Sequence, residues 1–564
     1  MNNRSSLPCW GPRRGGSRRG PSHVLTPVWT TRRTVKARPP CASRLGNHLP
    51  RGRRTTYHPA AGRNVDDRSP KEAPLIIDLW HGWNPADADA PAYIEEPVDD
   101  PFAVLAMAPP ATSVPLVRPH TDLGNCERLV DQYGAVVSYV GSWRKWLIWD
   151  GRRWVGDDNN LITYYAKQTV RSIAREVPGD AGHAKWAQRS EADARISAMV
   201  RLASSEPAVA ISPDQLDAND AYFTCGNGTI DLRTGRLLPH DPTNLCTKMT
   251  TVEFAPGAAC PAWLKFLDDI FEGNEGLKDY VKRAVGYSAT ASTREQVMFV
   301  LTGGGSNGKS TFLEILRLIF GDFSQQMPAS TLLEKRGSDS GPNNDVARLR
   351  GARFAAAVET AEERRLAEAQ VKSLTGGDTV TARYLHAEFF EFVPEAKIWL
   401  ATNHKPRITG SDDGIWRRLR LIPFNRKFSD EEKDLDLKNK LLAELPGILQ
   451  WVIEGALEWQ AHGLGTASAV RDATREYKTE QDTLGRFLEE ETLSEAPLKI
   501  SANHLYAAYS TWATNAGEKV ESQKAFGTKL TERGLDKGKH GPERRAYYFG
   551  IGLKPNTPTG QSPF

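Results

Sequence analysis

The chain has 564 residues, of which 39% are hydrophobic and 25% are charged. This composition is ordinary for a globular protein of about three or four domains, and no run approaches the roughly 18 consecutive apolar residues of a membrane-spanning helix. The formal net charge of +4 hides an uneven distribution, because residues 1–65 hold 13 arginines and one lysine but no acidic residue. The remainder carries 59 basic and 69 acidic residues, a net charge of −10, so any nucleic-acid contact in the folded part must be local.

The first 118 residues are expected to lie outside the folded part of the chain. Residues 1–65 lack hydrophobic periodicity and are predicted to be a disordered, arginine-rich tail. Such a tail suits a nonspecific nucleic-acid arm, a transit peptide or a start codon assigned too far upstream, although its Pro and Gly content opposes an amphipathic helix. Residues 66–118 are rich in Pro, Ala and Asp, which predicts a linker.

The first folded signal follows this linker. Trp146–Trp149 and Arg152–Trp154 flank Asp150-Gly151, which predicts a β-hairpin with a type I′ turn. Tryptophans beside basic residues suit base stacking, but more often they form a small core. From Leu161 to Leu202 the pattern is helical.

Residues Gly303 to Ser310 read Gly-Gly-Gly-Ser-Asn-Gly-Lys-Ser, the G-x-x-x-x-G-K-[ST] pattern of a phosphate-binding loop. The apolar run Val297–Leu301 precedes it and an apolar-rich helical pattern follows it, as this motif requires. Glycines let successive backbone N–H groups turn toward one anion, and the helix dipole adds positive potential. Lys309 is expected to reach the β- and γ-phosphates and the Ser310 hydroxyl to ligate Mg²⁺, so the predicted ligands are ATP and Mg²⁺. The predicted phosphate-binding residues are Gly303, Gly304, Gly305, Ser306, Asn307, Gly308, Lys309, Ser310 and Thr311.

A second apolar run, Arg353–Val358, is followed by a carboxylate. Glu359 is the leading candidate to hold the Mg²⁺-bound water and to polarise the attacking water. Glu362 and Glu363 follow closely, so the pattern leaves open which carboxylate faces the metal.

A third apolar run, Ile398–Thr402, ends in Asn403, which suits either a γ-phosphate contact or a turn. Further on, Arg417 and Arg418 precede another apolar segment. An arginine at this place is suited to serve the ATP of an adjacent subunit in trans.

The order and spacing of these motifs closely resemble those of superfamily 3 helicases. Within that group the chain resembles the phage/plasmid primase-helicase family, akin to the poxvirus-type primase-helicases, over roughly residues 120 to 480. The segments that carry the resemblance are Cys225–Leu232, Pro239–Pro242, Gly303–Thr311, Glu359, Lys372–Arg383, Thr402–Pro406 and Ile415–Arg418.

The resemblance implies a role for each matching residue. Lys309 and Ser310 match the phosphate-loop lysine and the metal-ligating hydroxyl, and Glu359 matches the second acidic motif. Asn403 matches the sensor asparagine. Arg418, with Arg417 as the alternative, matches the arginine finger.

The resemblance also implies contacts with DNA. Lys372 matches a basic residue that approaches the nucleotide or the DNA in this family. Val380–Leu385 and Phe389–Val393 predict a β-hairpin joined by His386-Ala387-Glu388, and such hairpins project into the central channel of hexameric helicases. Arg383 and His386 are therefore candidate DNA contacts; the alternative is a surface ion-pair partner and a turn residue.

Beyond the motor, helical patterns cover Leu441–Trp459 and Ala469–Glu491, and two further helices are marked by Leu505 to Trp512 and by Phe526 and Leu530. The basic turn Lys537–Pro542 and the strand Arg545–Phe549 follow. Helix, helix and basic hairpin predict a winged helix, either a DNA reader or a docking module for another replication protein.

The cysteines and the N-terminal part narrow the function. Six cysteines without C-x-x-C spacing fit a reducing cytoplasm. Many proteins that resemble this chain carry a primase with a zinc module in front of the helicase, but about 120 residues of tail and linker are expected to be too few to house one. No primase active site is recognised.

We therefore predict an α/β fold with an AAA+-like superfamily 3 core, preceded by a mainly α region and followed by a helical segment and a winged-helix-like domain. The expected function is that of a replicative DNA helicase of a phage, plasmid or integrated element in a bacterial cytoplasm. It would act as a ring-shaped homo-oligomer, expected to be a hexamer, on single-stranded DNA with 3′ to 5′ polarity. The alternatives are a P-loop ATPase that loads a replication complex without unwinding and a small-molecule kinase. The predicted segments are 1–65, 66–118, 119–260, 261–430 (ATPase), 431–490, 491–553 (winged helix) and 554–564.

Overall fold

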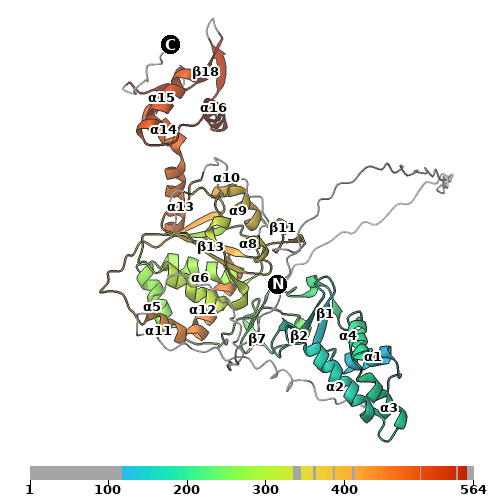
Figure 1. The fold of residues 1–564 in the computed structure, drawn as a ribbon. Helices are drawn as coiled ribbons and strands as arrows, with labels where there is room; N and C mark the ends of the chain where they lie inside the picture. Colours follow the sequence, from blue (N-terminus) through green and yellow to red (C-terminus); the bar gives the residue numbers. More distant parts are fainter. Residues whose placement is uncertain are drawn as a thin grey trace, which may run out of the picture. The chain divides into compact units, whose positions relative to one another are not determined.

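A computed structural model describes residues 117–334, 344–359, 364–384, 388–408, 413–495, 497–540 and 544–555 (Figure 1). The predicted tail and the predicted linker as far as residue 116 lie outside the described residues, as do Glu362, Glu363 and His386. Within the described residues, no helix combines the length and the apolar character needed to cross a membrane.

The region predicted to be the ATPase, called the ATPase region below, contains a five-stranded parallel sheet in the order β14-β8-β13-β10-β9. Every residue of β8 and β13 is buried, as expected for apolar strands covered on both faces. The strands are β8 (Met298–Thr302), β9 (Ser324–Gln326), β10 (Phe354–Glu359), β13 (Lys397–Thr402) and β14 (Leu419–Pro423). The parallel sheet confirms the α/β class, and the apolar runs Val297–Leu301, Arg353–Val358 and Ile398–Thr402 form most of β8, β10 and β13.

The connections leave the middle of the sheet in opposite directions. From β8 the chain passes β13 and β10 to reach the edge strand β9, whereas from β13 it passes β8 to reach the other edge, β14. Because β8 and β13 are neighbours, their carboxyl ends border a topological switch point. Ligands of open α/β sheets bind in the crevice at such a point.

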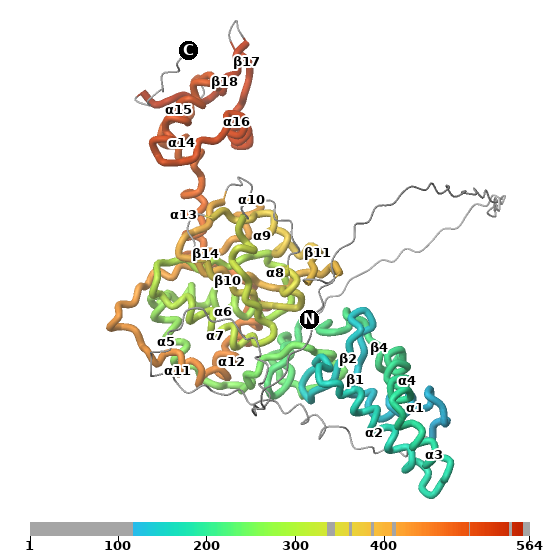
Figure 2. The backbone as a smooth tube through the Cα atoms, in the orientation of Figure 1, coloured from blue at the N-terminus to red at the C-terminus, as the bar shows by residue number. Residues whose placement is uncertain are grey.

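Helices cover both faces of the sheet, and successive side chains of β8 point alternately into the two cores. Phe299 and Leu301 pack with the helices of the first face, whereas Met298 and Val300 pack with those of the second. The first face holds α5 (Pro261–Ile270), α6 (Glu275–Ala289), α7 (Lys309–Phe320), α11 (Leu437–Ala443) and α12 (Leu445–His462). The second holds α8 (Asn344–Ala347), α9 (Glu368–Thr375) and α10 (Asp413–Trp416). Helix α13 (Ser468–Gln481) contributes to both cores, through Val470 on the first face and Tyr477 on the second. Figure 2 shows α13 beside β14, as their contacts require.

Helices α6 and α12 lie side by side in Figures 1 and 2, although more than 150 residues separate them in the sequence. Two glycines bring their backbones together. A Cβ atom on Gly286 would lie 2.1 Å from the amide nitrogen of Ala456, and one on Gly455 would lie 2.3 Å from the carbonyl oxygen of Lys282. Neither position accepts a side chain without moving a helix.

The region before the ATPase contains a helical part with its own core. Its four-stranded sheet has the order β3-β2-β1-β4, and the helical prediction for Leu161 to Leu202 is confirmed by α2, α3 and α4. Trp149 and Trp154 are buried in this core, as the core alternative predicts. The elements are α1 (Asp122–Tyr133), β1 (Val137–Val140), β2 (Lys145–Trp149), β3 (Trp154–Gly156), α2 (Leu161–Glu176), α3 (Ala181–Ser190), α4 (Asp193–Ala203) and β4 (Ala210–Ile211).

The predicted type I′ turn in this region is wrong. Trp149 pairs with Trp154, so four residues form the loop of the hairpin and not two. The carboxylate of Asp150 accepts hydrogen bonds from the backbone N–H groups of Arg152 and Arg153, both at 2.7 Å. An aspartate that bonds to the backbone two and three residues ahead stabilises this wider loop.

A second small sheet, β5-β6-β7, packs into the core of the ATPase region. Phe223 of β5 stacks on Phe323, and the Arg353 guanidinium donates to the carbonyl oxygens of Tyr222 at 2.7 Å and Ala289 at 3.0 Å. The strands are β5 (Tyr222–Cys225), β6 (Gly228–Asp231) and β7 (Arg236–Leu238).

The C-terminal part has its own core and the chain order helix, strand, strand, helix, helix, strand, strand, strand. Its three-stranded sheet has the order β16-β18-β17. Lys537–His540, predicted as part of a turn, forms strand β17, because each of its residues pairs with β18. The elements are α14 (Thr483–Glu491), β15 (Thr492–Leu493), β16 (Lys499–Ser501), α15 (Ala502–Asn515), α16 (Gln523–Glu532), β17, β18 (Arg545–Phe549) and β19 (Gly552–Leu553).

Candidate nucleotide-binding site

The glycine-rich loop joins β8 to α7 at the switch point of the sheet. Gly303, Ser306 and Gly308 have φ angles of 153°, 57° and 84°. A Cβ atom on Gly303 would lie 2.2 Å from the carbonyl oxygen of Phe424, and one on Gly308 would lie 2.8 Å from Cγ2 of Ile270. Both glycines are therefore required by space as well as by conformation.

Lys309 is the first residue of α7, and only 6% of its surface is exposed. Its ammonium group donates to the carbonyl oxygens of Gly303 at 2.7 Å and Gly304 at 3.2 Å. It also donates to the side-chain oxygens of Asn307 and Asn403, each at 3.1 Å. These four oxygens are neutral, and burial lowers the pKa of Lys309. The side chain is thus a buried cation held by dipoles.

Asn307 positions this lysine. Its side chain is buried, its oxygen accepts from Lys309, and its amide nitrogen donates to the carbonyl oxygen of Phe424 at 3.1 Å. The loop is thereby tied to the residue that follows β14. In the sequence Asn307 was only one of several loop residues, because the phosphate-loop pattern leaves this position unspecified.

The other predicted site residues lie at the same level on neighbouring strands of the sheet. Glu359 pairs with Thr402, and Thr402 pairs with Thr302, so these residues lie level on β10, β13 and β8. Neighbouring strands are about 4.8 Å apart, which puts the backbones of Glu359 and Thr302 about 10 Å apart. Asn403 follows Thr402 directly and reaches Lys309. The structure therefore brings Lys309, Asn403 and the half-buried Glu359 together at the carboxyl ends of the parallel strands.

Two of the predicted metal ligands are oxygen donors at these strand ends. Ser310 is exposed in the first turn of α7, and Glu359 ends β10. Hydroxyl and carboxylate oxygens are ligands that Mg²⁺ accepts, and the ion fills its remaining positions with water and phosphate. Among the residues that the structure describes, no group of three or more His, Cys, Asp or Glu side chains is placed to hold a metal by itself.

The two predicted arginines have different surroundings. Arg418 is buried, and its guanidinium donates to the Thr375 hydroxyl at 3.2 Å and to the Gly414 carbonyl oxygen at 2.7 Å. Arg417 is exposed. Both precede β14, whose residues run from Leu419 beside Met298 to Pro423 beside Thr302. They therefore lie at the amino ends of the strands, about 13 Å from the loop of their own chain, which lies at the carboxyl ends.

The predicted DNA contacts lie on elements other than the loop. The hairpin prediction is confirmed, because β11 (Val380–Ala382) and β12 (Phe390–Phe392) pair antiparallel. The Arg383 guanidinium stands 4.7 Å from the centre of the Phe389 ring, a side chain that is 63% exposed. Lys372 lies half-buried on α9.

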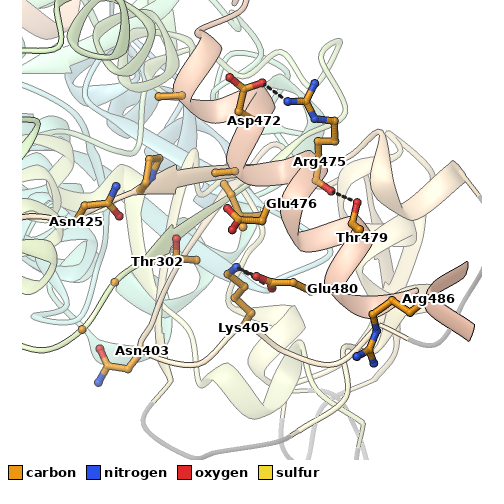
Figure 3. Close-up of a pocket in the computed structure, with 16 residues that line it drawn as sticks. Thr302, Asn403, Lys405, Asn425, Asp472, Arg475, Glu476, Thr479, Glu480 and Arg486 are labelled. Atoms are coloured by element: carbon orange, nitrogen blue, oxygen red, sulfur yellow. Dashed lines mark hydrogen bonds and ion pairs between the residues drawn. The ribbon is translucent and has the colours of Figure 1, made fainter. Parts of the chain in front are cut away.

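A cavity of about 870 Å³ adjoins the loop (Figure 3). Thr302, Gly303, Gly304 and Asn403 contribute to it, and much of the opposite wall comes from α13. The sequence predicted a helix over Ala469–Glu491, but its spacing gave no sign that one side would face the loop. The lining residues of α13 are Ala469, Asp472, Ala473, Arg475, Glu476, Thr479 and Glu480.

The fold and the site define the chain as an α/β protein with a glycine-rich loop and a buried lysine at the switch point of a parallel sheet. Two family models match it: "D5 N terminal like" over residues 126–272, and "Family of unknown function (DUF5906)" over residues 301–418.

Three viral relatives illustrate the similarity. The chain is 29% identical over 293 residues to the "Putative helicase" of Acanthamoeba polyphaga mimivirus, covering 48% of this chain and 30% of that protein. It is 26% identical over 270 residues to one of Frog virus 3, covering 44% and 28%. It is 25% identical over 327 residues to the "Putative primase" of African swine fever virus, covering 53% and 34%.

These matches confirm the resemblance to the phage-type primase-helicase family. The chain spans only 28% to 34% of the length of these three relatives. In a search of solved structures, the C-terminal region of NrS-1 aligns with a TM-score of 0.42 and 11% identity, covering 74% of this chain and 96% of that one.

Proposed function

We propose that the chain is an ATP-driven DNA helicase that works as a ring of identical subunits. The observation that carries the proposal is the state of Lys309, a buried cation whose four hydrogen-bond partners are neutral oxygens. A buried charge without a counter-charge is costly unless an anion joins it. A phosphate at the loop supplies that anion, and the switch point is where such a ligand binds.

The residues around Lys309 suit phosphoryl transfer to water. Bound Mg-ATP would supply the phosphoanhydride bond whose hydrolysis drives the motor. Backbone N–H groups of the loop and the Lys309 ammonium bind the phosphate oxygens, while Ser310 and Glu359 hold the metal. Asn403 and Glu359, at the ends of adjacent strands, orient the attacking water. The strand row that aligns Glu359 with Thr302 supports this division of roles.

The positions of the arginines support a trans arrangement. Neither Arg417 nor Arg418 reaches the loop of its own chain, so a role in hydrolysis requires a second subunit. Exposed Arg417 is then the residue that enters the neighbouring site, and Arg418, bonded to Thr375 and Gly414, fixes the backbone that presents it. This assignment reverses the order of preference drawn from the family resemblance.

The C-terminal part supports a nucleic-acid contact. The order α14, β16, α15, α16, β17, β18, to which β15 and β19 are added, supports the winged-helix prediction, in which α16 would be the recognition helix and β17–β18 the wing. Residues 523–540 and 544–555 carry eight Lys or Arg and two acidic residues. Such a local basic surface binds a phosphate backbone despite the acidic folded chain.

Measuring ATP hydrolysis with and without single-stranded DNA tests the proposal, together with strand displacement on a tailed duplex and the mass of the ATP-bound assembly. We expect DNA-stimulated hydrolysis, strand displacement and a ring-sized complex. Hydrolysis without displacement would identify a loader of replication complexes, and phosphate transfer to a small molecule without DNA stimulation would identify a kinase.

Primer synthesis is a second candidate, because the African swine fever virus relative is named a primase. An assay on single-stranded DNA with labelled nucleotides separates the two activities. Primers that are still made by a Lys309→Ala variant would assign synthesis to a site other than the loop.

A further inference from the structure

The cavity beside the loop differs in character from the loop itself. Its floor is apolar, since Leu421 and Pro423 of β14 meet Ala469 and Ala473 of α13. Its α13 wall carries the carboxylates of Asp472, Glu476 and Glu480, shown in Figure 3. Carboxylates repel a triphosphate, but they accept hydrogen bonds from hydroxyl groups. Lys405, Arg475 and Arg486 also line the cavity, so its charges are balanced. Its apolar floor and its carboxylates suit a ligand with an apolar ring and hydroxyl groups.

Two of the three carboxylates already have cationic partners. Asp472 accepts from Arg475 at 3.0 Å, and Glu480 accepts from Lys405 at 2.8 Å. The Glu476 carboxylate makes no hydrogen bond or ion pair with any other residue in the part of the chain that the structure describes. Figure 3 shows it on the side of α13 that faces Thr302, the residue before the loop. Its oxygens are thus available to a ligand in the cavity.

The cavity is continuous with the phosphate-binding loop. Gly303 and Gly304 line it and also hold the Lys309 ammonium. Asn425, just beyond β14, adds an amide that both donates and accepts. At about 870 Å³ the space is in the range of small-ligand sites, roughly 300 to 1,000 Å³. A nucleotide whose phosphates occupy the loop has room for its nucleoside here.

We propose that this cavity receives the ribose and base of the bound ribonucleoside triphosphate, and that Glu476 accepts hydrogen bonds from the ribose hydroxyls. The proposal rests on the proposed function, because it takes the phosphates to lie at the loop. The apolar floor packs against the base and Asn425 meets its polar edge. The pairing of a carboxylate with ribose hydroxyls is the same chemistry that dinucleotide-binding folds use.

The proposal predicts discrimination at the sugar. A deoxyribonucleotide lacks one hydroxyl, so Glu476 loses one hydrogen bond to a charged acceptor. Because the site is open to water, we expect the ribonucleotide to bind about tenfold more tightly. Glu476→Ala should bring the two affinities within about twofold, while Glu480→Ala, which removes a carboxylate already paired with Lys405, should keep the preference.

The experiment is equilibrium binding of non-hydrolysable ATP and deoxy-ATP analogues to the full chain and to these variants. A second arm uses Ala473→Leu, which fills the floor of the cavity, with inorganic tripolyphosphate as the probe. The variant should weaken binding of the ATP analogue about tenfold or more and leave tripolyphosphate binding unchanged, because only the nucleoside meets the new side chain.

The outcomes separate this proposal from the proposed function. If the wild-type chain binds both analogues equally, or if Glu476→Ala keeps the full preference, the nucleoside lies elsewhere and the inference is overturned, although the ATPase assignment stands. If neither analogue nor tripolyphosphate binds in a manner that depends on Lys309, the proposed function fails first. Unfolding midpoints of the variants equal to that of the wild type exclude a folding defect, since Glu476 is exposed.

Discussion

The ammonium group of Lys309 lies 3.1 Å from the side-chain oxygen of Asn403, a residue 94 positions later in the chain. The bond joins the residue proposed to bind phosphate to the residue proposed to sense it. A γ-phosphate that enters the loop competes with Asn403 for the same ammonium. Nucleotide binding should therefore release the Asn403 side chain for its second role, the alignment of water.

Replacing Lys309 with alanine removes the charge that the phosphate requires. We expect ATP hydrolysis to fall by about 10²-fold or more, the scale seen when a preorganised stabilising group is lost. Lys438→Ala is a matched control, because Lys438 makes an exposed ion pair with Glu314 of α7 and such pairs contribute little. Near-normal turnover in Lys309→Ala would remove the loop from the mechanism.

The substitution Asn403→Asp tests the effect of a negative charge beside Lys309, because aspartate and asparagine have nearly the same shape. Asn403→Asp places a carboxylate beside the Lys309 ammonium, so it should raise the pKa of that lysine and repel the triphosphate. We expect its affinity for ATP to be lower than that of Asn403→Ala, although alanine removes more atoms. Calorimetric titration of both variants measures this order. An Asp variant that binds ATP as well as the wild type would place Asn403 away from the phosphates.

The lowered pKa of Lys309 predicts a pH dependence of binding. Burial disfavours the charged lysine in the free protein, whereas a bound triphosphate favours it. Binding should then take up a proton between the lowered pKa and a value at or above the ordinary one of about 10.4. Affinity should be greatest below this window and should decrease as the pH rises through it. Titrations in buffers of different ionisation enthalpy count the protons, and Lys309→Arg, which stays charged, should show no uptake.

Replacing Arg417 and replacing Arg418 with alanine should have different effects. Arg417→Ala should fold normally and hydrolyse ATP on the order of 10³-fold more slowly, and mixing it with Glu359→Gln subunits should restore part of the activity at interfaces with both residues intact. Arg418→Ala should in addition lower the unfolding midpoint, because it leaves the buried Thr375 hydroxyl and the Gly414 carbonyl without this partner. Full hydrolysis by a strictly monomeric preparation contradicts the ring.

The β11–β12 hairpin should separate DNA binding from hydrolysis. We expect a variant with alanine at Arg383 and His386 to bind single-stranded DNA more weakly regardless of sequence, because backbone contacts carry no sequence information. The slope of affinity against salt should flatten by about one unit, since one phosphate partner is lost at neutral pH. Basal ATP hydrolysis should persist while unwinding stops. Normal unwinding would make the hairpin a scaffold and direct attention to Lys372 or the C-terminal part.

The strands of the ATPase region were predictable because each buried parallel strand is a continuous apolar run that ends in a polar residue. The run before Glu359 and the run before Asn403 therefore gave both the strand and the functional residue at its end. The parallel order that puts them side by side is a long-range property. The turn after Trp149 was wrong because Asp150 bonds to its neighbours' backbone and widens the loop, which a dipeptide signal does not reveal.

The lining of the cavity and the burial of the two arginines could not be predicted from the sequence. Motif order identified both arginines and preferred Arg418, but it did not show that Arg418 is buried, because its contact with Thr375 joins residues distant in the sequence. The helical pattern over α13 predicted a helix and not the direction in which Glu476 points. These properties depend on how α13 packs against β14 and how α10 packs against α9, which periodicity within one segment does not encode.

The glycine contact between α6 and α12 has a mechanical consequence. Two helices whose backbones touch at Gly286 and Gly455 cannot slide past each other without first separating, so this pair is a stiff support beneath one face of the sheet. The proposed motor needs a fixed part as well as a moving one. Any movement that follows hydrolysis must then be made by elements joined through side chains alone. Helix α13 is such an element. It contacts β14 through Thr474 and the loop after Asn403 through the ion pair of Lys405 and Glu480.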